Sequence, residues 1–365
     1  MSIIKRLPSN ILNLKPYVAG KSIEEVKKEY QLERIAKLAS NENRLGCSPF
    51  VEEAVMKAFQ QIHNYPRPAA DDLRHAIAEK NGVNVDEILV AAGSESIISI
   101  LCRTCFKNDE HAITADATFV GFFVQAGVRG IKLNKVPITE DYRFDVRGIL
   151  DEINDKTKMV YIANPNNPTG TYITKDEYQQ LLKGVPEDVL LIVDEAYYEY
   201  AKSVEDYPDA LYSRKDNVII LRTFSKAYGL AGMRIGYAIA NRSLITEMMK
   251  TKLTFEPSAL AQAAALAAYK DDDFISKSVH VVEEGKERLY SFFESQNISY
   301  RKSISNSVMI IFDSEKKAAN YTQKMLENGV ILRQIGAFGL PNCIRVTIGT
   351  KEDMQHFENV HKKIT

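Results

Sequence analysis

The stretch Val218–Gly236, VIILRTFSKAYGLAGMRIG, joins an apolar run to a segment interrupted by three glycines. Its first part, Val218–Phe224, is mostly apolar, which is typical of a strand buried on both faces of a sheet. Lys226 follows this run closely, and Arg234 lies eight residues further on. A surface lysine needs no such setting, so we expect Lys226 to have a chemical task.

Six further runs of this kind lie between helical patterns: Glu87–Gly93, His111–Asp116, Ile131–Ile138, Met159–Pro165, Leu190–Tyr197 and Arg234–Ala240. Together the seven runs predict an α/β fold with a mostly parallel seven-stranded sheet flanked by helices. Because the strands of such a sheet end at a common edge, we expect the functional groups in the loops that follow the strands.

The character of the chain changes after residue 255, where a smaller α+β domain is predicted. Its elements are an alanine-rich helix, a long charged helix near Asp273–Gln296, strands at Ser307–Phe312 and Cys343–Gly349, and a terminal helix from Lys351. The expected divisions are an N-terminal arm at 1–36 that packs with the small domain, a large domain at 37–255 and the small domain at 256–365.

Composition excludes several classes of protein. The 365 residues are 45% hydrophobic and 26% charged, with a net charge of −1 and no block of basic residues that would indicate nucleic-acid binding. The first ten residues lack the apolar core of a secretory signal. The most apolar later stretch, Ala259–Tyr269, is too short to span a bilayer. We therefore expect a cytoplasmic protein with no membrane or nucleic-acid partner.

The four cysteines are Cys47, Cys102, Cys105 and Cys343. Cys102 and Cys105 form a C-x-x-C pair, but no second pair or nearby histidines complete a zinc site, so no metal is expected. The pair lies in a helical pattern, where residues three apart share one face. Core packing is the favoured interpretation, and a redox role stays open.

Two nucleotide-binding motifs are also excluded. Gly20-Lys21-Ser22 resembles the end of a P-loop, but Lys15 stands where the first glycine is required. The glycines at 229, 232 and 236 do not fit G-x-G-x-x-G and do not follow a first strand.

Polar groups do gather at the ends of the predicted strands. Ser94 and Glu95 open a helix after Gly93, where free N–H groups and the helix dipole favour a phosphate. Asn167 lies in a loop stiffened by two prolines, and Asp194 ends an apolar strand, where a carboxylate is costly without a cation. With Lys226 and Arg234, these groups match what pyridoxal phosphate requires: an amine for its aldehyde, a carboxylate for its pyridine nitrogen and an anion cradle.

The sequence resembles the fold-type-I pyridoxal-phosphate aminotransferases and, within them, the histidinol-phosphate aminotransferase family. The resemblance runs from near Leu14 to the C-terminus. It is carried by Ala39–Asn43, Asn64–Pro66, Ala92–Glu95, Asn164–Gly170, Val193–Tyr197, Thr223–Lys226 through Arg234, and Ile344–Thr350.

The resemblance implies roles for residues around the cofactor. Lys226 would form a Schiff base with it and carry the catalytic proton, and Asp194 would keep the pyridine nitrogen protonated. Asn167 and Tyr197 would bind the ring oxygen, and Phe119 would stack on the ring. The phosphate would be held by the Ser94 and Glu95 amides, Thr223, Ser225 and Arg234.

The resemblance also implies partners and substrate contacts. Tyr65 matches a tyrosine that reaches the phosphate from a neighbouring subunit, which implies a homodimer with a shared active site. Arg345 matches the arginine that binds the substrate's anionic end. Arg333 and Tyr17 match further contacts to a phosphate-bearing substrate.

Two positions depart from the family pattern. Arg44 stands where a proline commonly follows Ser-Asn-Glu-Asn, and Phe255-Glu-Pro-Ser258 replaces the more typical Tyr/Phe-Asn-Val-Asn. Glu256 would bring a negative charge near the pocket and disfavour anionic substrates unless Arg44 or another base pairs with it.

The reaction implied is transamination between L-histidinol phosphate and 2-oxoglutarate, giving imidazole-acetol phosphate and L-glutamate, in histidine biosynthesis. The alternatives are an aromatic amino acid (Phe/Tyr) aminotransferase of the same family and a decarboxylase of a phosphorylated amino acid. A non-catalytic binding protein is disfavoured by the intact set Lys226, Asp194, Asn167, Tyr197 and Arg234.

Overall fold

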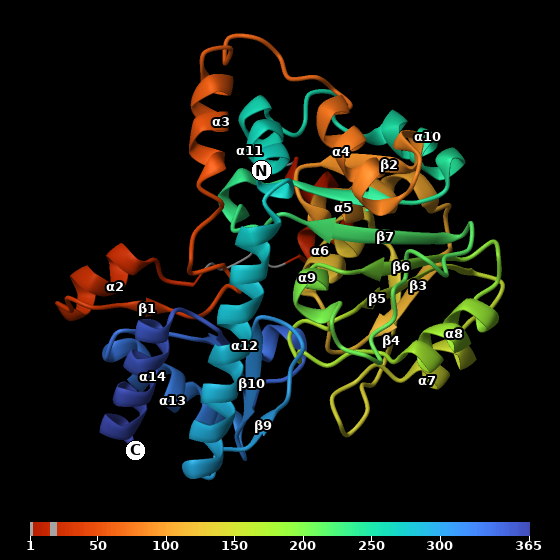
Figure 1. The fold of residues 1–365 in the computed structure, drawn as a ribbon. Coiled ribbons are helices and arrows are strands. Elements are labelled where there is room, and N and C mark those ends of the chain that lie inside the picture. The colour runs from red at the N-terminus through yellow and green to blue at the C-terminus, as the bar shows by residue number, and fades with distance from the viewer. Residues whose placement is uncertain (1–2, 15–19) are drawn as a thin grey trace.

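The structure, a computed structural model, describes residues 3–14 and 20–365, whose strands form sheets of seven, four and two strands (Figure 1). The largest sheet has the order β2-β8-β7-β6-β5-β3-β4. Its strands are β2 (Ile88–Ala91), β3 (His111–Ala115), β4 (Lys132–Val136), β5 (Thr157–Ala163), β6 (Leu190–Asp194), β7 (Val218–Thr223) and β8 (Gly236–Ile239). The predicted seven-stranded, mostly parallel sheet is confirmed.

Strand β8 alone runs against the others in this sheet. It pairs antiparallel with β2 and β7, whereas the remaining neighbours pair in parallel. The carboxyl ends of the other six strands therefore meet at one edge, and the amino end of β8 lies at that same edge. As a result Arg234, two residues before β8 begins, joins the residues that follow the parallel strands.

Helices cover both faces of this sheet. One face packs against α5 (Ser94–Cys105), α6 (Val120–Arg129) and α10 (Arg242–Thr251). The other packs against α4 (Asp71–Asn81), α7 (Val146–Asp151), α8 (Lys175–Gly184) and α9 (Tyr198–Ala201). Along β6, Leu190 and Ile192 enter the first core while Leu191 and Val193 enter the second, as the two-residue period of a strand requires.

A buried ion pair joins the ends of β6 and β7. Arg222 Nε and Nη2 lie 2.9 and 2.8 Å from Glu195 Oε2, and the two residues are 3% and 0% exposed. Burial raises the pKa of the Glu195 carboxyl to about 7, and the Arg222 charge opposes that rise. Since side chains alternate, the chain neighbours Asp194 and Thr223 point to the opposite face, toward α5.

The four-stranded sheet is antiparallel, with the order β12-β13-β10-β9. Its strands are β9 (Tyr300–Arg301), β10 (Ser307–Ile311), β12 (Arg333–Gln334) and β13 (Cys343–Thr347); β1 (Ala36–Lys37) pairs in parallel with β11 (Val330–Ile331). The helices here are α12 (Asp272–Ser295), α13 (Glu315–Glu327) and α14 (Lys351–Ile364). Short 3-10 helices lie at Ile4–Arg6, Val85–Glu87, Ala231–Met233 and Gly336–Phe338.

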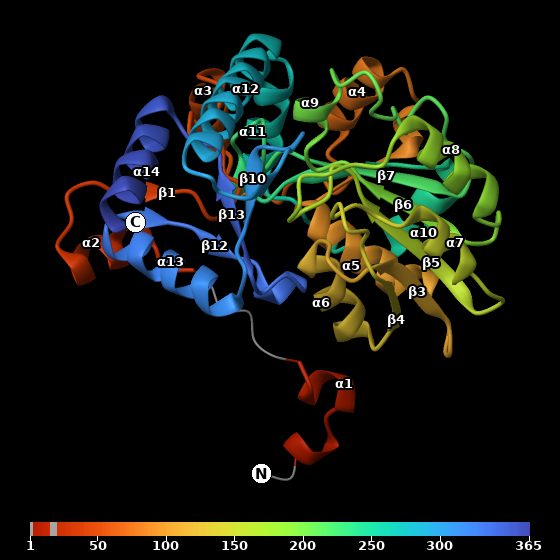
Figure 2. The same ribbon diagram turned by 90° about the horizontal axis from the view of Figure 1, so that it is seen from below.

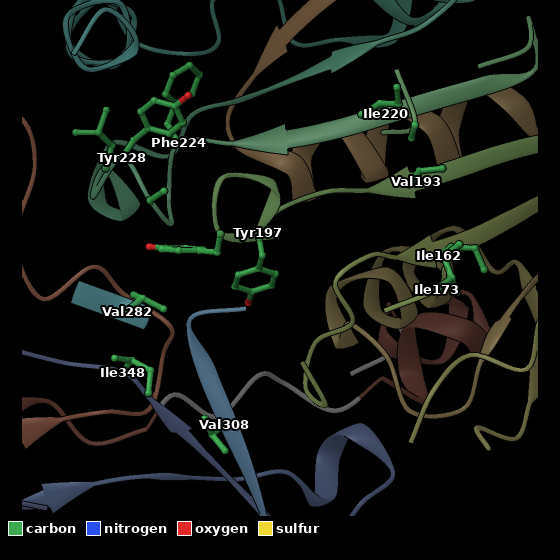
Figure 3. Close-up of a cluster of buried hydrophobic side chains, with 14 of the residues drawn as sticks. Ile162, Ile173, Val193, Tyr197, Ile220, Phe224, Tyr228, Val282, Val308 and Ile348 are labelled. Carbon is green, nitrogen blue, oxygen red and sulfur yellow. The ribbon is translucent and has the colours of Figure 1, made fainter. Parts of the chain in front are cut away.

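One apolar core runs from the large sheet into this second part of the chain. Figure 3 shows Tyr197 after the end of β6, with its ring directed toward β10. Val308 of β10, Val282 of α12 and Ile348 belong to the same buried cluster as Val193 of β6. Helix α11 (Ala259–Tyr269) also packs against α3 (Phe50–Phe59) and α4, although the sequence places it in the small domain. The boundaries at 36 and 255 stay predictions.

The N-terminal arm differs from its prediction. Helix α2 (Ile23–Tyr30) packs against α13, as expected of an arm on the small domain. Helix α1 (Ser9–Leu12) instead contacts α6 (Figure 2). The Asn10 amide donates to the carbonyls of Gly127 and Val128 at 3.1 and 3.0 Å. The small residue Gly127 leaves room for Leu14 there. The expectation that the whole arm packs with the small domain is therefore wrong for residues 9–14.

Gly170 ends the Asn164–Gly170 loop and allows the close contact of this loop with Ser303. Its φ is +75°, and a β-carbon there would lie 2.1 Å from Ser303 Oγ.

We expect Gly170→Ala to lower the free energy of unfolding by about 1–3 kcal/mol, because alanine would be strained and overlap Ser303. Urea unfolding would measure this, with Gly20→Ala as the control, since no atom of the described residues lies within 4 Å of a β-carbon at Gly20. An unchanged midpoint for Gly170→Ala would contradict this account.

Candidate active site

A pocket opens at the edge where the strands of the large sheet end. It holds about 570 Å³ of empty space, part of it open to solvent. Its lining includes ten of the predicted site residues: Ser94, Glu95, Phe119, Asn167, Asp194, Tyr197, Thr223, Ser225, Lys226 and Arg234. Ala163, Pro165 and Ala196 complete the lining. These groups come from the ends of β2, β3, β5, β6 and β7 and from the start of β8, so they gather at the strand ends as expected, while their roles stay predictions.

The start of α5 forms one wall of this pocket. Gly93 caps the helix with a φ of 90°, and the Arg234 guanidinium packs over it, 3.0 Å from where a β-carbon would lie. Gly236 lets β8 approach equally closely, since its β-carbon would lie 2.9 Å from the Ser94 nitrogen. The free N–H groups of this helix end and a guanidinium thus face the same space, which suits an anion.

Hydroxyl groups complete the anion cradle. Thr223 Oγ1 donates to Ser225 Oγ at 3.1 Å and accepts from the Ser225 backbone N–H at 3.2 Å. Arg234 Nη1 also donates to Ser225 Oγ, at 3.2 Å. Arg234 itself adopts a left-handed backbone with φ of 52°, which directs its side chain back toward Ser225. One cation, two hydroxyls and a helix end can therefore bind a phosphate without movement of the backbone.

Asp194 provides a buried carboxylate in the pocket. The residue is 3% exposed, and its Oδ2 accepts a hydrogen bond from the Tyr161 hydroxyl at 2.7 Å. Its Oδ1 accepts from the Ala196 N–H at 3.2 Å. Burial raises the Asp194 pKa to about 6, whereas these two bonds and the charge of Lys226 lower it. A cation placed beside this carboxylate would favour its charged form further.

Lys226 lies beside this carboxylate, half-buried in the pocket wall. Its Nζ is 3.4 Å from the Ser40 carbonyl oxygen and 5.7 Å from the centre of the Tyr197 ring. Burial lowers the pKa of the Lys226 amine to about 8, with further lowering by the positive charges of Arg345 and Arg234. Near neutral pH this amine can therefore both hold and release a proton, unlike an ordinary surface lysine.

Two residues that support the pocket were not predicted. Asn41, 1% exposed with a φ of 54°, donates to the Tyr197 hydroxyl at 2.8 Å and accepts from the Thr347 hydroxyl at 2.9 Å. Tyr161 holds Asp194 as described above. Asn41 lies in the stretch Ala39–Asn43 that carries the resemblance, and this was the one available signal; Tyr161 is one aromatic residue within an apolar run.

Arg345 reaches the rim of the pocket from β13. Its Nη1 donates to Asn167 Oδ1 at 2.5 Å and its Nη2 to the Ala39 carbonyl at 2.6 Å. Arg333 lies opposite Arg345 in the antiparallel pairing of β12 with β13. The structure thus places the two predicted substrate arginines next to each other. Tyr17, the third predicted contact, lies outside the described residues.

Tyr65 does not line the pocket of its own chain. It is 80% exposed, and its ring stacks on that of Phe255 with 4.3 Å between centroids.

Arg44 and Glu256, the two departures from the family pattern, do not pair with each other in the fold. Arg44 Nε pairs with Asp353 Oδ2 at 3.0 Å, whereas Glu256 accepts a hydrogen bond from the Ser96 hydroxyl at 2.8 Å. Glu256 is thus held by α5 and does not line the pocket.

The cysteine pair lies away from this pocket. Cys102 is buried in the apolar core and Cys105 packs against it; both thiols are free, and burial raises their pKa to about 12 and about 11. Within residues 3–14 and 20–365, no group of three or more His, Cys, Asp or Glu side chains is placed to hold a metal. Over the same residues, no helix is both long and apolar enough to cross a membrane.

Comparisons with known proteins agree with this geometry. The family model for aminotransferase class I and II matches residues 33–359. A histidinol-phosphate aminotransferase of Geobacillus sp. (strain WCH70) is 42% identical over 348 residues, covering 95% of this chain and 94% of the relative. A histidinol-phosphate aminotransferase 1 of Bacillus cereus (strain ATCC 10987 / NRS 248) is 40% identical over 361 residues, covering 98% and 96%.

A solved structure is similar over almost the whole chain. The histidinol-phosphate aminotransferase of Sinorhizobium meliloti, in complex with pyridoxal-5'-phosphate, superposes with a TM-score of 0.89 at 27% identity, covering 99% of this chain and 98% of that one. The fold and the matched family define an aminotransferase of class I and II. Within that class, the chain belongs to the histidinol-phosphate aminotransferase family.

The lowered pKa of Lys226 can be tested in the cofactor-free protein. We expect the rate of modification of Lys226 by an amine-reactive reagent to reach half its plateau near pH 8, because only the neutral amine reacts. Peptide mass spectrometry after short labelling at a series of pH values would measure it. Arg345→Met should move the midpoint upward, since the Arg345 charge disfavours the ammonium form. A midpoint near 10.5 would show that the pocket does not perturb this amine.

Proposed function

We propose that this chain is a pyridoxal-phosphate-dependent aminotransferase of the cytoplasm that converts L-histidinol phosphate and 2-oxoglutarate to imidazole-acetol phosphate and L-glutamate. The names of its relatives support the reaction. The observation that carries the substrate is the pairing of Arg333 with Arg345 across β12 and β13, beside a pocket that contains an amine, a buried acid and an anion cradle. Two guanidinium groups suit a doubly charged phosphate monoester better than a single carboxylate.

The residues of the pocket fit pyridoxal phosphate. Its phosphate would be held by the start of α5 with Thr223, Ser225 and Arg234, and its pyridine nitrogen by Asp194. Asp194 is the one buried acid among the described residues that line the pocket, and a cation beside it would offset its desolvation. When bound, pyridoxal phosphate supplies an aldehyde that takes up the amino group and a ring that accepts electrons.

The chain's own groups would then position and move protons. Lys226 Nζ, with its pKa of about 8, would hold the aldehyde and carry a proton to and from the reacting carbon. The Tyr197 hydroxyl, oriented by Asn41, and the Asn167 amide would bind the ring oxygen. Phe119, which packs over Gly121 at the start of α6, would cover one face of the ring.

Arg345 connects substrate binding to these groups. Its guanidinium already donates to Asn167, so an anionic substrate at Arg345 would lie next to a residue that binds the ring oxygen. Arg333 adds a second positive charge from the adjacent strand. The same fork of N–H donors suits the carboxylate of glutamate, which must bind in the second half of the reaction.

We also propose a homodimer with a shared site. Exposed apolar residues gather on α3 and on the segments that carry the stacked Tyr65 and Phe255 rings: Phe50, Met56, Phe59, Ile62, Tyr65, Leu253 and Phe255. A surface of this kind on a water-soluble domain commonly marks a protein interface. Its position supports an arrangement in which Tyr65 reaches the phosphate of the partner's cofactor.

Single half-reactions test the proposed substrate. With the purified pyridoxal-phosphate form, we expect L-histidinol phosphate to discharge the cofactor's visible absorbance much faster than L-phenylalanine or L-tyrosine does, and L-glutamate also to react. Stopped-flow absorbance at a common substrate concentration would compare them. Lys226→Ala is the control that should react with none of the four. Faster reaction with the aromatic amino acids would make this chain an aromatic aminotransferase.

Arg333→Ala separates phosphate recognition from general amino-donor binding. We expect kcat/KM for L-histidinol phosphate to fall by about 10- to 150-fold, because a charge-assisted contact of about 1.5–3 kcal/mol is removed. Glutamate should lose much less, since Arg345 remains for its carboxylate. Steady-state kinetics with both donors would measure the two ratios, and equal losses would remove the argument that Arg333 recognises phosphate.

A further inference from the structure

The stacked Tyr65 and Phe255 rings form an exposed pair on two segments that are joined by hydrogen bonds from other parts of the chain. Both rings are solvent-exposed, at 80% and 46%. They belong to segments nearly 190 residues apart in the sequence, 65–68 and 253–257, which we call the tyrosine platform. Ordering an exposed aromatic ring costs side-chain entropy and buries little apolar surface, so it adds little to the stability of the fold.

A buried lysine joins the two segments of the platform. Lys252, only 7% exposed, follows the last residue of α10. Its Nζ donates to the Pro68 carbonyl at 2.9 Å and the Leu253 carbonyl at 3.2 Å, and also to the Glu256 carbonyl. These acceptors use all three ammonium N–H groups, and one of them lies on the opposite segment. A buried ammonium must keep its hydrogen-bond acceptors, so these three backbone carbonyls constrain the course of both segments.

A second side chain joins the same two segments. Gln262 on α11 donates through Nε2 to the Arg67 carbonyl at 3.0 Å and to the Pro257 carbonyl at 2.9 Å. Two independent donors thus bridge residues 67–68 to residues 253–257. Neither donor lines the active-site pocket of its own chain.

The platform is also tied to the anion cradle. The Glu256 carboxylate accepts from the Ser96 hydroxyl at 2.8 Å, and Ser96 lies in the first turn of α5, two residues after Ser94. The segment that carries Phe255, the stacking partner of Tyr65, is therefore hydrogen-bonded to the helix start that would hold this chain's own cofactor phosphate.

We propose that Lys252, assisted by Gln262, is a positioning residue: it holds the Tyr65–Phe255 stack so that the Tyr65 hydroxyl meets the cofactor phosphate bound by a second copy of this chain. This inference rests on the homodimer with a shared site proposed above. It assigns a task to a buried lysine that contacts neither cofactor nor substrate. The platform is preorganised, so the partner phosphate gains a hydrogen bond without the cost of ordering a loop.

A double-mutant cycle on the full-length dimer tests this inference. The measured quantity is the Kd of pyridoxal phosphate for cofactor-free protein, followed by the change in absorbance on titration, with pyridoxal as the probe that lacks the phosphate. Tyr65→Phe should weaken pyridoxal phosphate by about tenfold or more, the loss expected for one charge-assisted hydrogen bond, and leave pyridoxal unchanged. Lys252→Met should weaken pyridoxal phosphate by about fivefold in the native background and have no effect in the Tyr65→Phe background.

A matched control is Lys250→Met in the last turn of α10, where the exposed Lys250 pairs with Glu247. It should leave both affinities unchanged. If Lys252→Met does not yield a folded dimer by sedimentation and circular dichroism, Gln262→Leu enters the same cycle with the same expectation of non-additivity.

The outcomes are distinct. Non-additivity with Tyr65→Phe, confined to the phosphate-bearing probe, supports the positioning role. Equal losses from Lys252→Met in both backgrounds, or no loss in either, would overturn it while leaving the shared site intact. No effect of Tyr65→Phe itself would instead overturn the shared site, and the positioning role with it.

Discussion

The ion pair between Arg222 and Glu195 is the interaction on which the active-site edge depends. Glu195 directly follows β6 and Arg222 lies in β7, so the pair joins the ends of these two strands on the face opposite α5, almost fully shielded from solvent. Removing one partner would leave a buried charge, which costs about 3–5 kcal/mol in other proteins. Because side chains alternate along a strand, a pair fixed on the rear face also fixes Asp194 and Thr223 on the front face. The distance between Asp194 and Thr223 is therefore set by the Arg222–Glu195 ion pair, although this pair contacts neither side chain.

The sequence predicts well whatever depends on local pattern. All seven strands of the large sheet were expected, because runs such as Val218–Phe224 are apolar enough to be buried on both faces. Their ends were expected too far along; the run Leu190–Tyr197 stops being a strand at Asp194, where polar groups begin and the chain turns into the pocket. Two-residue strands such as Arg333–Gln334 carry too little periodicity to be recognised.

Local sequence patterns do not predict which side chains distant in the sequence form hydrogen bonds or ion pairs with each other. The order of residues indicates that Lys226, Asp194 and Arg234 share an edge, but not that Tyr161 would hold Asp194 or Asn41 would hold Tyr197. The roles of Arg44 and Glu256 were similarly open, because nothing local says which of several acids a half-buried arginine will meet. In the fold Arg44 meets Asp353, and Glu256 is held by a hydroxyl on α5. Likewise residues 9–14 pack at the C-terminal end of α6, where two small residues, Gly127 and Gly130, leave room for the side chains of Leu14 and Asn10.

Arg333 and Arg345 lie on a different sheet from the groups around the cofactor pocket, and this separation bears on how substrate preference can evolve. Lys226, Asp194 and the anion cradle lie at the strand ends of the large sheet, whereas Arg333 and Arg345 lie on β12 and β13 of the four-stranded sheet. With the roles proposed above, a change in the β12–β13 hairpin would alter which amine is accepted without changing the groups proposed to carry the chemistry. Asn167 connects the residues around the cofactor pocket to the two arginines, because Arg345 donates a hydrogen bond to it. A lineage that drifts toward a new donor would be expected to keep this single bond while its neighbours on β12 vary.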